Sequence, residues 1–393
     1  MNFDQFHCLG EISTTEFLTQ YWQKKPLLIR GAFPDLATLI SAEELAGLAC
    51  EEHVNARLVL EKHATKPWQL EFGPFEESRF NDLPNSHWSL LVSDVEKHYP
   101  DTREILKAFR FIPDWRIDDL MISYAAPNGS VGAHTDAYDV FLIQLSGQRL
   151  WKISEHFSDE TLEDIDLSIL KNFTAEQEWL VNTGDMLYLP PNVAHHGIAQ
   201  LVKDKNNREQ HCMTASVGFR APSLKTITND YVHFLSENLT TRYQDKNPTA
   251  PKHHAEISDD TVSHFIDELQ KGLTMERDQV KRWLGQYCSD NKAFDDINND
   301  TLNQESAISL DELNNITRKN TLEQSSYSHF LFSNTDDVTL LFVDGQSHEV
   351  SSKFAKVLCD DIKIDVKQLQ KIMTDNDRHT LLTLYNNGSI IAV

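Results

Sequence analysis

Two histidines and one aspartate are spaced so that they can bind one metal ion. One residue separates His134 from Asp136, and His195 closes a later run that begins at Gly184. Residues two apart on a β-strand point to the same face, so His134 and Asp136 can reach one ion together, with His195 arriving from another strand. Two imidazoles and a carboxylate occupy one face of an octahedral ion and leave the other face open. This ligand set is typical of non-haem Fe(II) oxygenases.

The sequence around His195 strengthens this interpretation. Gly184, Pro190, Asn192 and His195 have the spacing of the second cupin motif, with asparagine where glycine is usual. A His-x-Asp pair alone is a weak signal in a chain with 17 histidines, so the second motif is the more informative one.

The first cupin motif is present in altered form. Gly129 precedes His134 and Gly147 closes the motif, but the usual second histidine is Asp136 and the usual glutamate is missing. This departure favours a three-ligand oxygenase site over the four-ligand site of other cupins.

Three further residues compete with the ligand set or lie beside it. His196 adjoins His195 and is expected to point elsewhere, so His195 is preferred. Asp139 lies on the strand face opposite to Asp136 and is expected to be structural or to lie at the rim. His211 is expected to be an ordinary strand histidine. The alternative for the whole set is a loop histidine, a turn carboxylate and a surface histidine that do not meet.

An oxygenase of this kind also needs electrons to reduce dioxygen, and 2-oxoglutarate supplies them. The distal carboxylate of 2-oxoglutarate requires a buried cation, and Arg149 is the candidate, at the start of a strand after the Ser146-Gly147 turn. An arginine fork binds a carboxylate through two parallel hydrogen bonds and stays charged when buried. Ser123, on the strand that leads to the metal loop, is a candidate hydroxyl donor. The alternatives are a solvated strand arginine and a packed serine.

The elements that must position these residues are short strands. Between Asp119 and Phe219, apolar runs alternate with Gly, Pro, Asn and Asp. A buried strand at residues 27–29 follows a short helix that a capping box at Ser13 and Glu16 opens. Residues 41–110 are expected to mix helices and loops. The density of strands after Asp119 indicates a closed or sandwiched β core. The strands predicted there are 120–124, 140–145, 149–153, 186–189 and 213–219.

After Pro222 the pattern becomes helical. Apolar residues at spacings of three and four predict helices over 224–241 and 257–288. The polar stretch from Ser289 to about Glu305 is expected to be a linker. Helices followed by a hairpin resemble a winged helix. The elements predicted in this last part are a hairpin at 340–345, helices at 353–359 and 365–373, and a terminal hairpin over 381–393.

Length, charge and cysteines limit the class of protein. The 393 residues indicate two or three domains, and a net charge of −24 disfavours nucleic acid and membranes and favours basic partners. Residues 291–393 contain 9 Lys and Arg against 16 Asp and Glu, so a nucleic-acid-binding wing is not expected. No run of about 18 apolar residues predicts a membrane span. The five scattered cysteines and an N-terminus without a signal core favour the cytoplasm.

Several segments together resemble a known family. These are residues 21–30, 114–121, 131–132, 138–141 and 216–222, which surround the metal motif or close its domain. On them the chain resembles the JmjC-type bacterial ribosomal oxygenases, a cupin group of 2-oxoglutarate-dependent protein hydroxylases. The similarity runs nearly from end to end.

The resemblance implies an α+β fold of three parts. A double-stranded β-helix catalytic domain would cover residues 1–221, a helical dimerisation region 222–290, and a winged-helix-like domain 291–393. The implied activity is 3-hydroxylation of an arginine in the sixteenth protein of the large ribosomal subunit, releasing succinate and CO2. The implied roles are iron ligation by His134, Asp136 and His195, and binding of 2-oxoglutarate by Arg149.

Two other functions remain open from the sequence. Other JmjC proteins demethylate N-methyl-lysine, and a cupin that binds metal without catalysis could act as a regulator through its winged helix. A basic ribosomal protein is the expected substrate of the hydroxylase, and the expected assembly is a homodimer. Tyr138 is a candidate substrate-side aromatic that stacks on a guanidinium, with core packing as the alternative.

Overall fold

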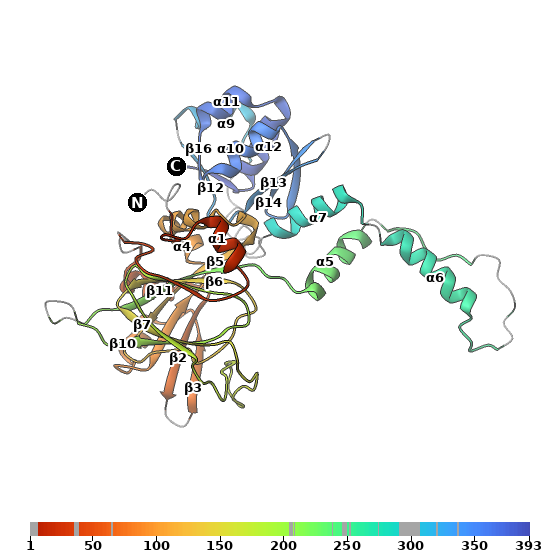
Figure 1. Cartoon of the computed structure of the whole chain (residues 1–393). Helices are drawn as coiled ribbons and strands as arrows, with labels where there is room; N and C mark the ends of the chain where they lie inside the picture. Colours follow the sequence, from red (N-terminus) through yellow and green to blue (C-terminus); the bar gives the residue numbers. More distant parts are fainter. Residues whose placement is uncertain are drawn as a thin grey trace. The chain divides into compact units, whose positions relative to one another are not determined.

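A computed structural model describes most of the chain as two compact units, Met1–Ala221 and Pro222–Val393 (Figure 1). Among the described residues, no helix has both the length and the apolar character needed to span a bilayer. The residues described are 7–34, 39–63, 66–203, 207, 209–237, 239–245, 250, 253–273, 275–290, 307–319, 321–335 and 338–393.

The first unit is built on two antiparallel β-sheets. The larger has the strand order β1-β9-β6-β11-β5-β4-β2-β3, and the smaller has the order β10-β7-β8. Its strands are β1 (Leu27–Ile29), β2 (Ala56–His63), β3 (Lys66–Phe72), β4 (Trp88–Val92), β5 (Ile117–Ala125), β6 (Val140–Ser146), β7 (Gln148–Ser154), β8 (Gln177–Asn182), β9 (Met186–Leu189), β10 (Ala194–Gln200) and β11 (Cys212–Phe219). Its helices are α1 (Thr14–Gln20), α2 (Ala42–Leu48), α3 (Glu77–Asn81), α4 (Val95–His98) and the 3-10 helices η1 (Pro100–Phe109) and η2 (Asp114–Arg116).

The strands that the sequence predicted are present. All five strands expected after Asp119 are found, as is the one at Leu27–Ile29. The expectation that residues 41–110 mix helices and loops was wrong, because β2, β3 and β4 lie there. The central part of β2, Leu58 to Leu60, is buried on both faces, so it lacks the alternation that marks a half-buried strand.

A helical layer covers the outer face of the larger sheet. Ser13 caps α1 by accepting a hydrogen bond from the Glu16 N–H at 3.1 Å. The ring of Phe17 packs against Phe141 and Tyr188, at centroid distances of 5.6 and 5.0 Å. Because side chains alternate along β6, the neighbours of Phe141 point to the opposite face, toward the smaller sheet. The apolar core on the helix side therefore fixes which residues of β6 face the space between the sheets.

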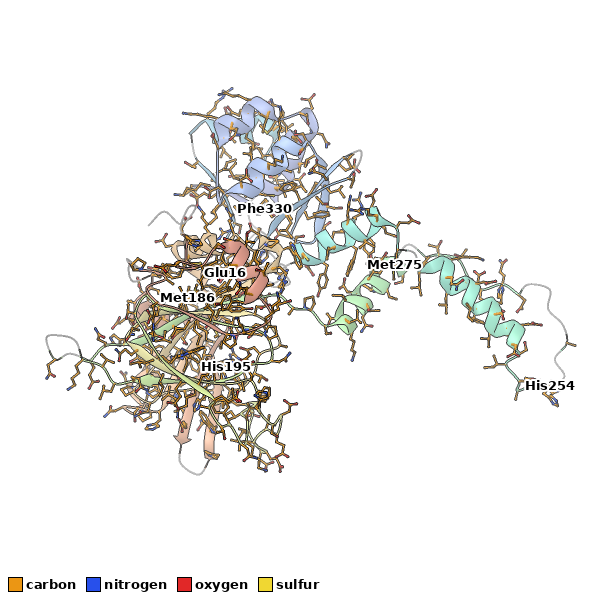
Figure 2. The ribbon with its side chains drawn as sticks, viewed as in Figure 1. Glu16, Met186, His195, His254, Met275 and Phe330 are labelled. Atoms are coloured by element: carbon orange, nitrogen blue, oxygen red, sulfur yellow. The ribbon has the colours of Figure 1, made fainter. Side chains whose placement is uncertain are left out.

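The second unit combines helices with a small β domain. The segment predicted as one helix over 257–288 is two helices, α6 and α7, and α7 packs on the sheet β13-β14-β15, where Gly285 leaves room for the Phe342 ring. Phe330, labelled in Figure 2, belongs to the core of this domain. The elements are α5 (Leu224–Ser236), α6 (Asp259–Gly272), α7 (Arg277–Ser289), α9 (Leu310–Lys319), β12 (Leu322–Gln324), β13 (Phe330–Asn334), β14 (Thr339–Val343), β15 (Gln346–Val350), α10 (Ser352–Asp360), β16 (Lys363–Ile364), α11 (Val366–Ile372), α12 (Asp375–Asn386) and β17 (Ile390–Ala392).

The hairpin β14–β15 and the helices α10 and α11 agree with the predictions, but the terminal hairpin was wrong. A capping box between Thr374 and Asp377 starts α12, which buries Leu381 and Leu384 at helical spacing. Gly388, with a φ of 76°, follows the end of this helix rather than forming a hairpin turn. Strand β17 does exist, but it pairs with β12. Most of the expected linker, residues 291–305, lies outside the described part of the chain.

Candidate metal centre

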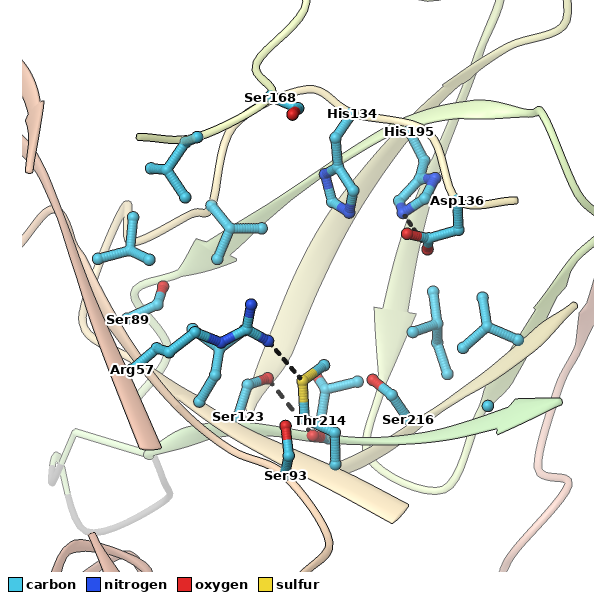
Figure 3. A pocket seen from close by; sticks show the side chains of 18 of the residues that line it. Arg57, Ser89, Ser93, Ser123, His134, Asp136, Ser168, His195, Thr214 and Ser216 are labelled. Atoms are coloured by element: carbon cyan, nitrogen blue, oxygen red, sulfur yellow. Dashed lines mark hydrogen bonds and ion pairs between the residues drawn. The ribbon is translucent and has the colours of Figure 1, made fainter. Parts of the chain in front are cut away.

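His134, Asp136 and His195 converge on the space between the two sheets. Their possible ligand atoms, one from each side chain, lie within 4.8 Å of one another. Nε2 of His195 is 3.6 Å from Oδ2 of Asp136, and the two imidazole centroids are 4.2 Å apart. Figure 3 shows the three side chains together on one side of a pocket. Among the described residues, no other group of three His, Cys, Asp or Glu side chains is this close.

Backbone pairing fixes the two histidines. The N–H of His134 donates to the carbonyl oxygen of His195 at 3.0 Å, and the reverse bond is 2.9 Å. Nδ1 of each ring lies 3.0 Å from a carbonyl oxygen two residues earlier, in Gly132 and Val193. Because a carbonyl only accepts, Nδ1 of each ring donates this hydrogen bond, which leaves Nε2 as the ring atom available to a metal. Both Nε2 atoms are therefore suited to bind a metal.

Asp136 sits in the loop before β6, not on a strand as the His-x-Asp argument assumed. His134 itself forms only an isolated bridge. The carbonyl oxygen of Asp136 accepts a hydrogen bond from the Asn192 N–H at 2.8 Å, which holds the loop against the turn before β10. Asn192 has a φ of 60°, the left-handed conformation that explains why cupins usually carry glycine here. Burial raises the pKa of Asp136, and the nearby His134 and a hydrogen bond from Tyr138 oppose this shift.

His195 is almost fully buried, at 3% exposure. Burial, with a smaller contribution from His134, lowers the pKa of His195 to about 3. Its imidazole is therefore neutral at physiological pH, which is the form that binds metals.

A cavity of about 350 Å³ adjoins the three side chains. Inward-facing positions at every second residue of the strands line it, and Figure 3 shows Ser123, Thr214 and Ser216 on the wall opposite the triad. The cavity is large enough for a small dicarboxylic acid and a substrate side chain together.

Arg149 lies in this cavity, as the sequence predicted. It is 5% exposed, and two of its nitrogens, Nε and Nη2, have no hydrogen-bond partner among the described residues. Its guanidinium carbon is 5.7 Å from the ring centroid of Trp151. A buried guanidinium with two unpaired nitrogens is unfavourable, so this site has the chemistry expected for an anionic ligand. The solvated strand arginine is excluded.

Ser123 and Tyr138 also line the cavity. Ser123 is buried, and its hydroxyl donates to the Thr214 carbonyl oxygen at 3.4 Å, a long bond that leaves it able to turn toward a ligand. Tyr138 is 41% exposed, so the alternative of core packing was wrong. It stands at the open side of the cavity beside Asp136.

His196, His211 and Asp139, which the sequence did not favour as ligands, do not line the cavity. His196 faces Phe173, with ring centroids 6.2 Å apart, and His211 is exposed near the Tyr124 hydroxyl. Asp139 is fully buried and accepts hydrogen bonds from Tyr188, at 2.6 Å, and from Gln23, at 3.0 Å. Its role is structural, because it ties the start of β6 to the N-terminal segment.

Sequence reasoning missed most of the cavity lining, including Arg57, Asp119 and Trp151. Burial, together with a smaller effect of the Asp94 carboxylate, raises the pKa of Asp119 to about 7. The period of two along β5 was the available signal for Asp119, since it lies four residues before Ser123. Trp151 is similarly two residues after Arg149. Arg57 comes from β2, a strand that the sequence did not predict.

Known proteins provide an independent comparison. Residues 104–227 match the JmjC domain family, and residues 268–390 match the ROXA-like winged helix. The ribosomal protein uL16 3-hydroxylase of Escherichia coli K12 is 35% identical over 287 residues, which cover 72% of this chain and 73% of that protein. A probable ribosomal oxygenase of Haemophilus influenzae is 38% identical over 225 residues, covering 56% of this chain and 53% of that protein.

Solved structures agree over the whole chain. The crystal structure of E. coli YcfD has a TM-score of 0.81 at 27% identity and covers 98% of this chain and 99% of that one. The structure of the E. coli ribosomal oxygenase YcfD with cobalt and 2-oxoglutarate has a TM-score of 0.78 at 28% identity, covering 97% and 98%. The motifs, the fold and these similarities lead to one conclusion: the chain belongs to the JmjC-type ribosomal oxygenases that carry a C-terminal winged helix.

Proposed function

We propose that this protein is an Fe(II)- and 2-oxoglutarate-dependent hydroxylase that acts on C3 of an arginine in ribosomal protein uL16. The 35% identical relative from E. coli is named for 3-hydroxylation of that protein. The substrate is a ribosomal protein, and we place the reaction in the cytoplasm on that ground.

One observation supports the co-substrate most directly. A cluster of two histidines and a carboxylate shares a cavity with a buried guanidinium whose Nε and Nη2 have no hydrogen-bond partner among the described residues. His134, Asp136 and His195 would hold the iron, and Arg149 would bind the distal carboxylate of 2-oxoglutarate. Iron bound with 2-oxoglutarate and dioxygen supplies the oxidising power to insert one oxygen atom into a C–H bond, with release of succinate and CO2.

The protein's own contribution is to orient the metal ligands and the co-substrate and to exclude water from them. The paired backbones of His134 and His195 and the Asn192 turn hold the ligand set in place. The buried position of Arg149 lets it bind a carboxylate in a region of low dielectric, where charge-assisted hydrogen bonds are strong. The hydroxyl of Ser123 would add a neutral donor on the same wall.

The open side of the cavity suits a guanidinium. A methyl group placed on Gly218 would lie 2.9 Å from Oδ1 of Asp119 and 3.9 Å from a ring carbon of Tyr138, so the carboxylate and the ring flank one glycine. A substrate arginine here would pair with Asp119 and stack on Tyr138. Pairing would also lower the raised pKa of Asp119, because an adjacent cation favours the ionised carboxylate.

The loop between β7 and β8 gives the rim of the cavity a negative charge. Its residues Leu167, Ser168 and Ile169 line the cavity, while the preceding part is rich in exposed acids. This charge is complementary to a basic ribosomal protein and would attract it during association. The exposed acids are Glu155, Asp159, Glu160, Glu163, Asp164 and Asp166.

The test is incubation of the purified protein with uL16, Fe(II) and 2-oxoglutarate, followed by mass spectrometry of the peptides. We expect a gain of one oxygen atom on one arginine, with stoichiometric succinate. Asp119→Asn should reduce turnover of this substrate while leaving 2-oxoglutarate binding in place. An unmodified uL16 in the presence of a bound metal and co-substrate would refute the substrate assignment.

The rival reaction is demethylation of N-methyl-lysine. A bifunctional lysine-specific demethylase and histidyl-hydroxylase of Brugia malayi is 33% identical over 103 residues, only 24% of this chain. Formaldehyde release from methylated lysine peptides, without oxygen gain on uL16, would favour this reaction instead.

We further propose that the protein is a homodimer formed through its helical region. No described residue of α6 is buried, and its apolar residues recur at helical spacing. Met275, after α6, is 82% exposed (Figure 2). Light scattering should give twice the mass of 45.1 kDa, and a monomer would refute the proposal. The apolar residues concerned are Val262, Phe265, Ile266, Leu269 and Leu273.

A further inference from the structure

Trp151 presents a buried indole N–H for which the described part of the chain offers no hydrogen-bond acceptor. The residue lines the cavity and is only 5% exposed. Its Nε1 atom has no partner among the described residues. A buried donor without an acceptor from the protein is rarely kept without a reason. The unpaired nitrogens of Arg149 belong to the same cavity. One ligand that accepts hydrogen bonds from both residues is the simplest explanation for these unpaired donors.

The indole lies between the expected carboxylate anchor and the metal ligands. Arg149 and Trp151 are two residues apart on β7 and therefore face the same side. The guanidinium carbon of Arg149 is 5.7 Å from the Trp151 ring centroid, and the His195 ring centroid is 5.8 Å from it on the neighbouring strand. A ligand that extends from Arg149 to the metal must pass along this ring.

A glycine on the paired strand holds the ring in this place. Gly197 is the register partner of Trp151. A Cβ added at Gly197 would lie 2.7 Å from two carbons of the six-membered ring of Trp151, closer than real contacts allow. The absence of a side chain at residue 197 therefore makes room for the indole in this position.

We propose that the indole N–H of Trp151 donates a hydrogen bond to a carboxylate oxygen of 2-oxoglutarate and positions the co-substrate between Arg149 and the metal ligands. This inference rests on the proposed function. A dicarboxylic acid provides an acceptor for the orphaned donors of both residues, whereas an apolar ligand would leave them unpaired. Trp151 is thus a binding residue for the co-substrate in addition to a wall of the cavity.

The test uses the full-length protein loaded with Zn(II), which permits binding without turnover. Trp151→Phe keeps an aromatic ring but removes the N–H. Calorimetry should show that 2-oxoglutarate binds this variant about tenfold or more weakly, the effect expected for one hydrogen bond to a charged group. An equal affinity in the variant and the native protein would overturn the proposal.

A second measurement separates a hydrogen bond from simple packing. The seven tryptophans give seven indole N–H signals in a nitrogen-15 spectrum, and the Trp151→Phe spectrum identifies the one from Trp151. This signal should shift downfield when 2-oxoglutarate is added. An unmoved signal, with bound co-substrate verified by calorimetry, would also overturn the proposal.

The matched control is Trp179→Phe. Trp179 is the register partner of Trp151 on β8, but it does not line the cavity. Its substitution should leave the affinity for 2-oxoglutarate unchanged, and an equal loss in this variant would count against a specific role of Trp151. If the native protein does not bind 2-oxoglutarate at all, the proposed function is refuted. If the native protein binds it and the Trp151→Phe variant binds equally well, only the role of Trp151 is refuted.

Discussion

His134 and His195 exchange both backbone hydrogen bonds, at 3.0 and 2.9 Å, and thereby place their imidazole centroids 4.2 Å apart. The pairing joins strand β10 to a loop that is distant from it in the sequence. Each ring is also oriented by the carbonyl oxygen of the residue two positions earlier, Gly132 and Val193. The ligand set is therefore preorganised, and a metal gains affinity because little has to be reordered on binding.

Removal of either histidine should abolish metal binding without unfolding the protein. His134→Ala and His195→Ala keep the backbone pairing but lose a ligand, so we expect affinity for Co(II) to fall more than about 100-fold, beyond the loss usual for supporting residues. Calorimetry measures the affinity and circular dichroism the fold. His196→Ala is the control, since that ring faces Phe173, and a comparable loss in this variant would contradict the ligand assignment.

Asn192 offers a test of how the Asp136 loop is held. Its φ of 60° suits asparagine and glycine but not a β-branched residue. Asn192→Gly should be nearly neutral, whereas Asn192→Val should destabilise the protein by about 1–2 kcal/mol and weaken metal binding, because the turn that donates to the Asp136 carbonyl must shift. Urea denaturation and metal titration measure the two effects. Equal behaviour of the two variants would contradict this explanation.

Arg149 should lower the stability of the ligand-free protein. Its buried guanidinium has unpaired nitrogens, so Arg149→Met should raise the free energy of unfolding of the ligand-free protein by about 1–3 kcal/mol. The same variant should lose most of its affinity for 2-oxoglutarate. Denaturation with and without 2-oxoglutarate checks both parts. A variant that is less stable and still binds would mean that the arginine is structural.

The site shows where sequence reasoning succeeds and where it stops. His134, Asp136, His195 and Arg149 were predictable because motif spacing and strand position are local properties. The neighbourhood of Asp119 was not, because it depends on β5 pairing with β4 and β11, a contact between segments that are far apart in the sequence.

The wrong terminal hairpin has a different cause. Residues 381–385 are a short apolar run, and its length does not distinguish a strand from a turn of buried helix. The capping box at Thr374 and Asp377 was the informative signal. Asp377 also accepts hydrogen bonds from the Ser351 N–H and hydroxyl, at 2.8 and 2.7 Å, so the start of α12 is fixed by a tertiary contact that no local pattern shows.

A buried carboxyl on α4 predicts how stability changes with pH. Burial raises the pKa of Glu96 to about 8, and Asp94 contributes in the same direction while Lys97 opposes it. Because this pKa is higher in the folded protein than in the unfolded chain, the stabilisation is complete below about pH 4.5. It is lost as the pH rises through about 8, at up to about 1.4 kcal/mol per pH unit.

Glu96→Gln should remove this dependence. The glutamine oxygen can still accept the Leu120 N–H that Glu96 accepts at 3.0 Å. The variant should therefore gain stability relative to the native protein as the pH rises from 5.5 to 8.5, measured by urea denaturation at both values. Glu11→Gln at an exposed position is the control. If the difference in unfolding free energy between the variant and the native protein is the same at both pH values, Glu96 does not titrate as inferred.

The acidic loop between β7 and β8 should act on association with the substrate rather than on chemistry. Replacing Asp159, Glu163 and Asp166 by their amides removes three exposed charges near the cavity but no residue that lines it. We expect the KM for uL16 to rise several-fold at low salt while kcat and the affinity for 2-oxoglutarate stay unchanged. The difference in KM between the variant and the native protein should shrink at about 0.5 M salt, because exposed charges are then screened within a few ångströms.

A remote charge change separates this effect from net charge. Removing three acids anywhere makes the protein less negative, so a general electrostatic attraction would respond to any of them. Asp360, Asp365 and Asp375 belong to the second unit and provide such a triple variant. If the loop beside the cavity guides the basic substrate, only the β7–β8 variant raises KM. Equal increases in both variants would mean that the whole acidic surface, rather than this loop, attracts the substrate.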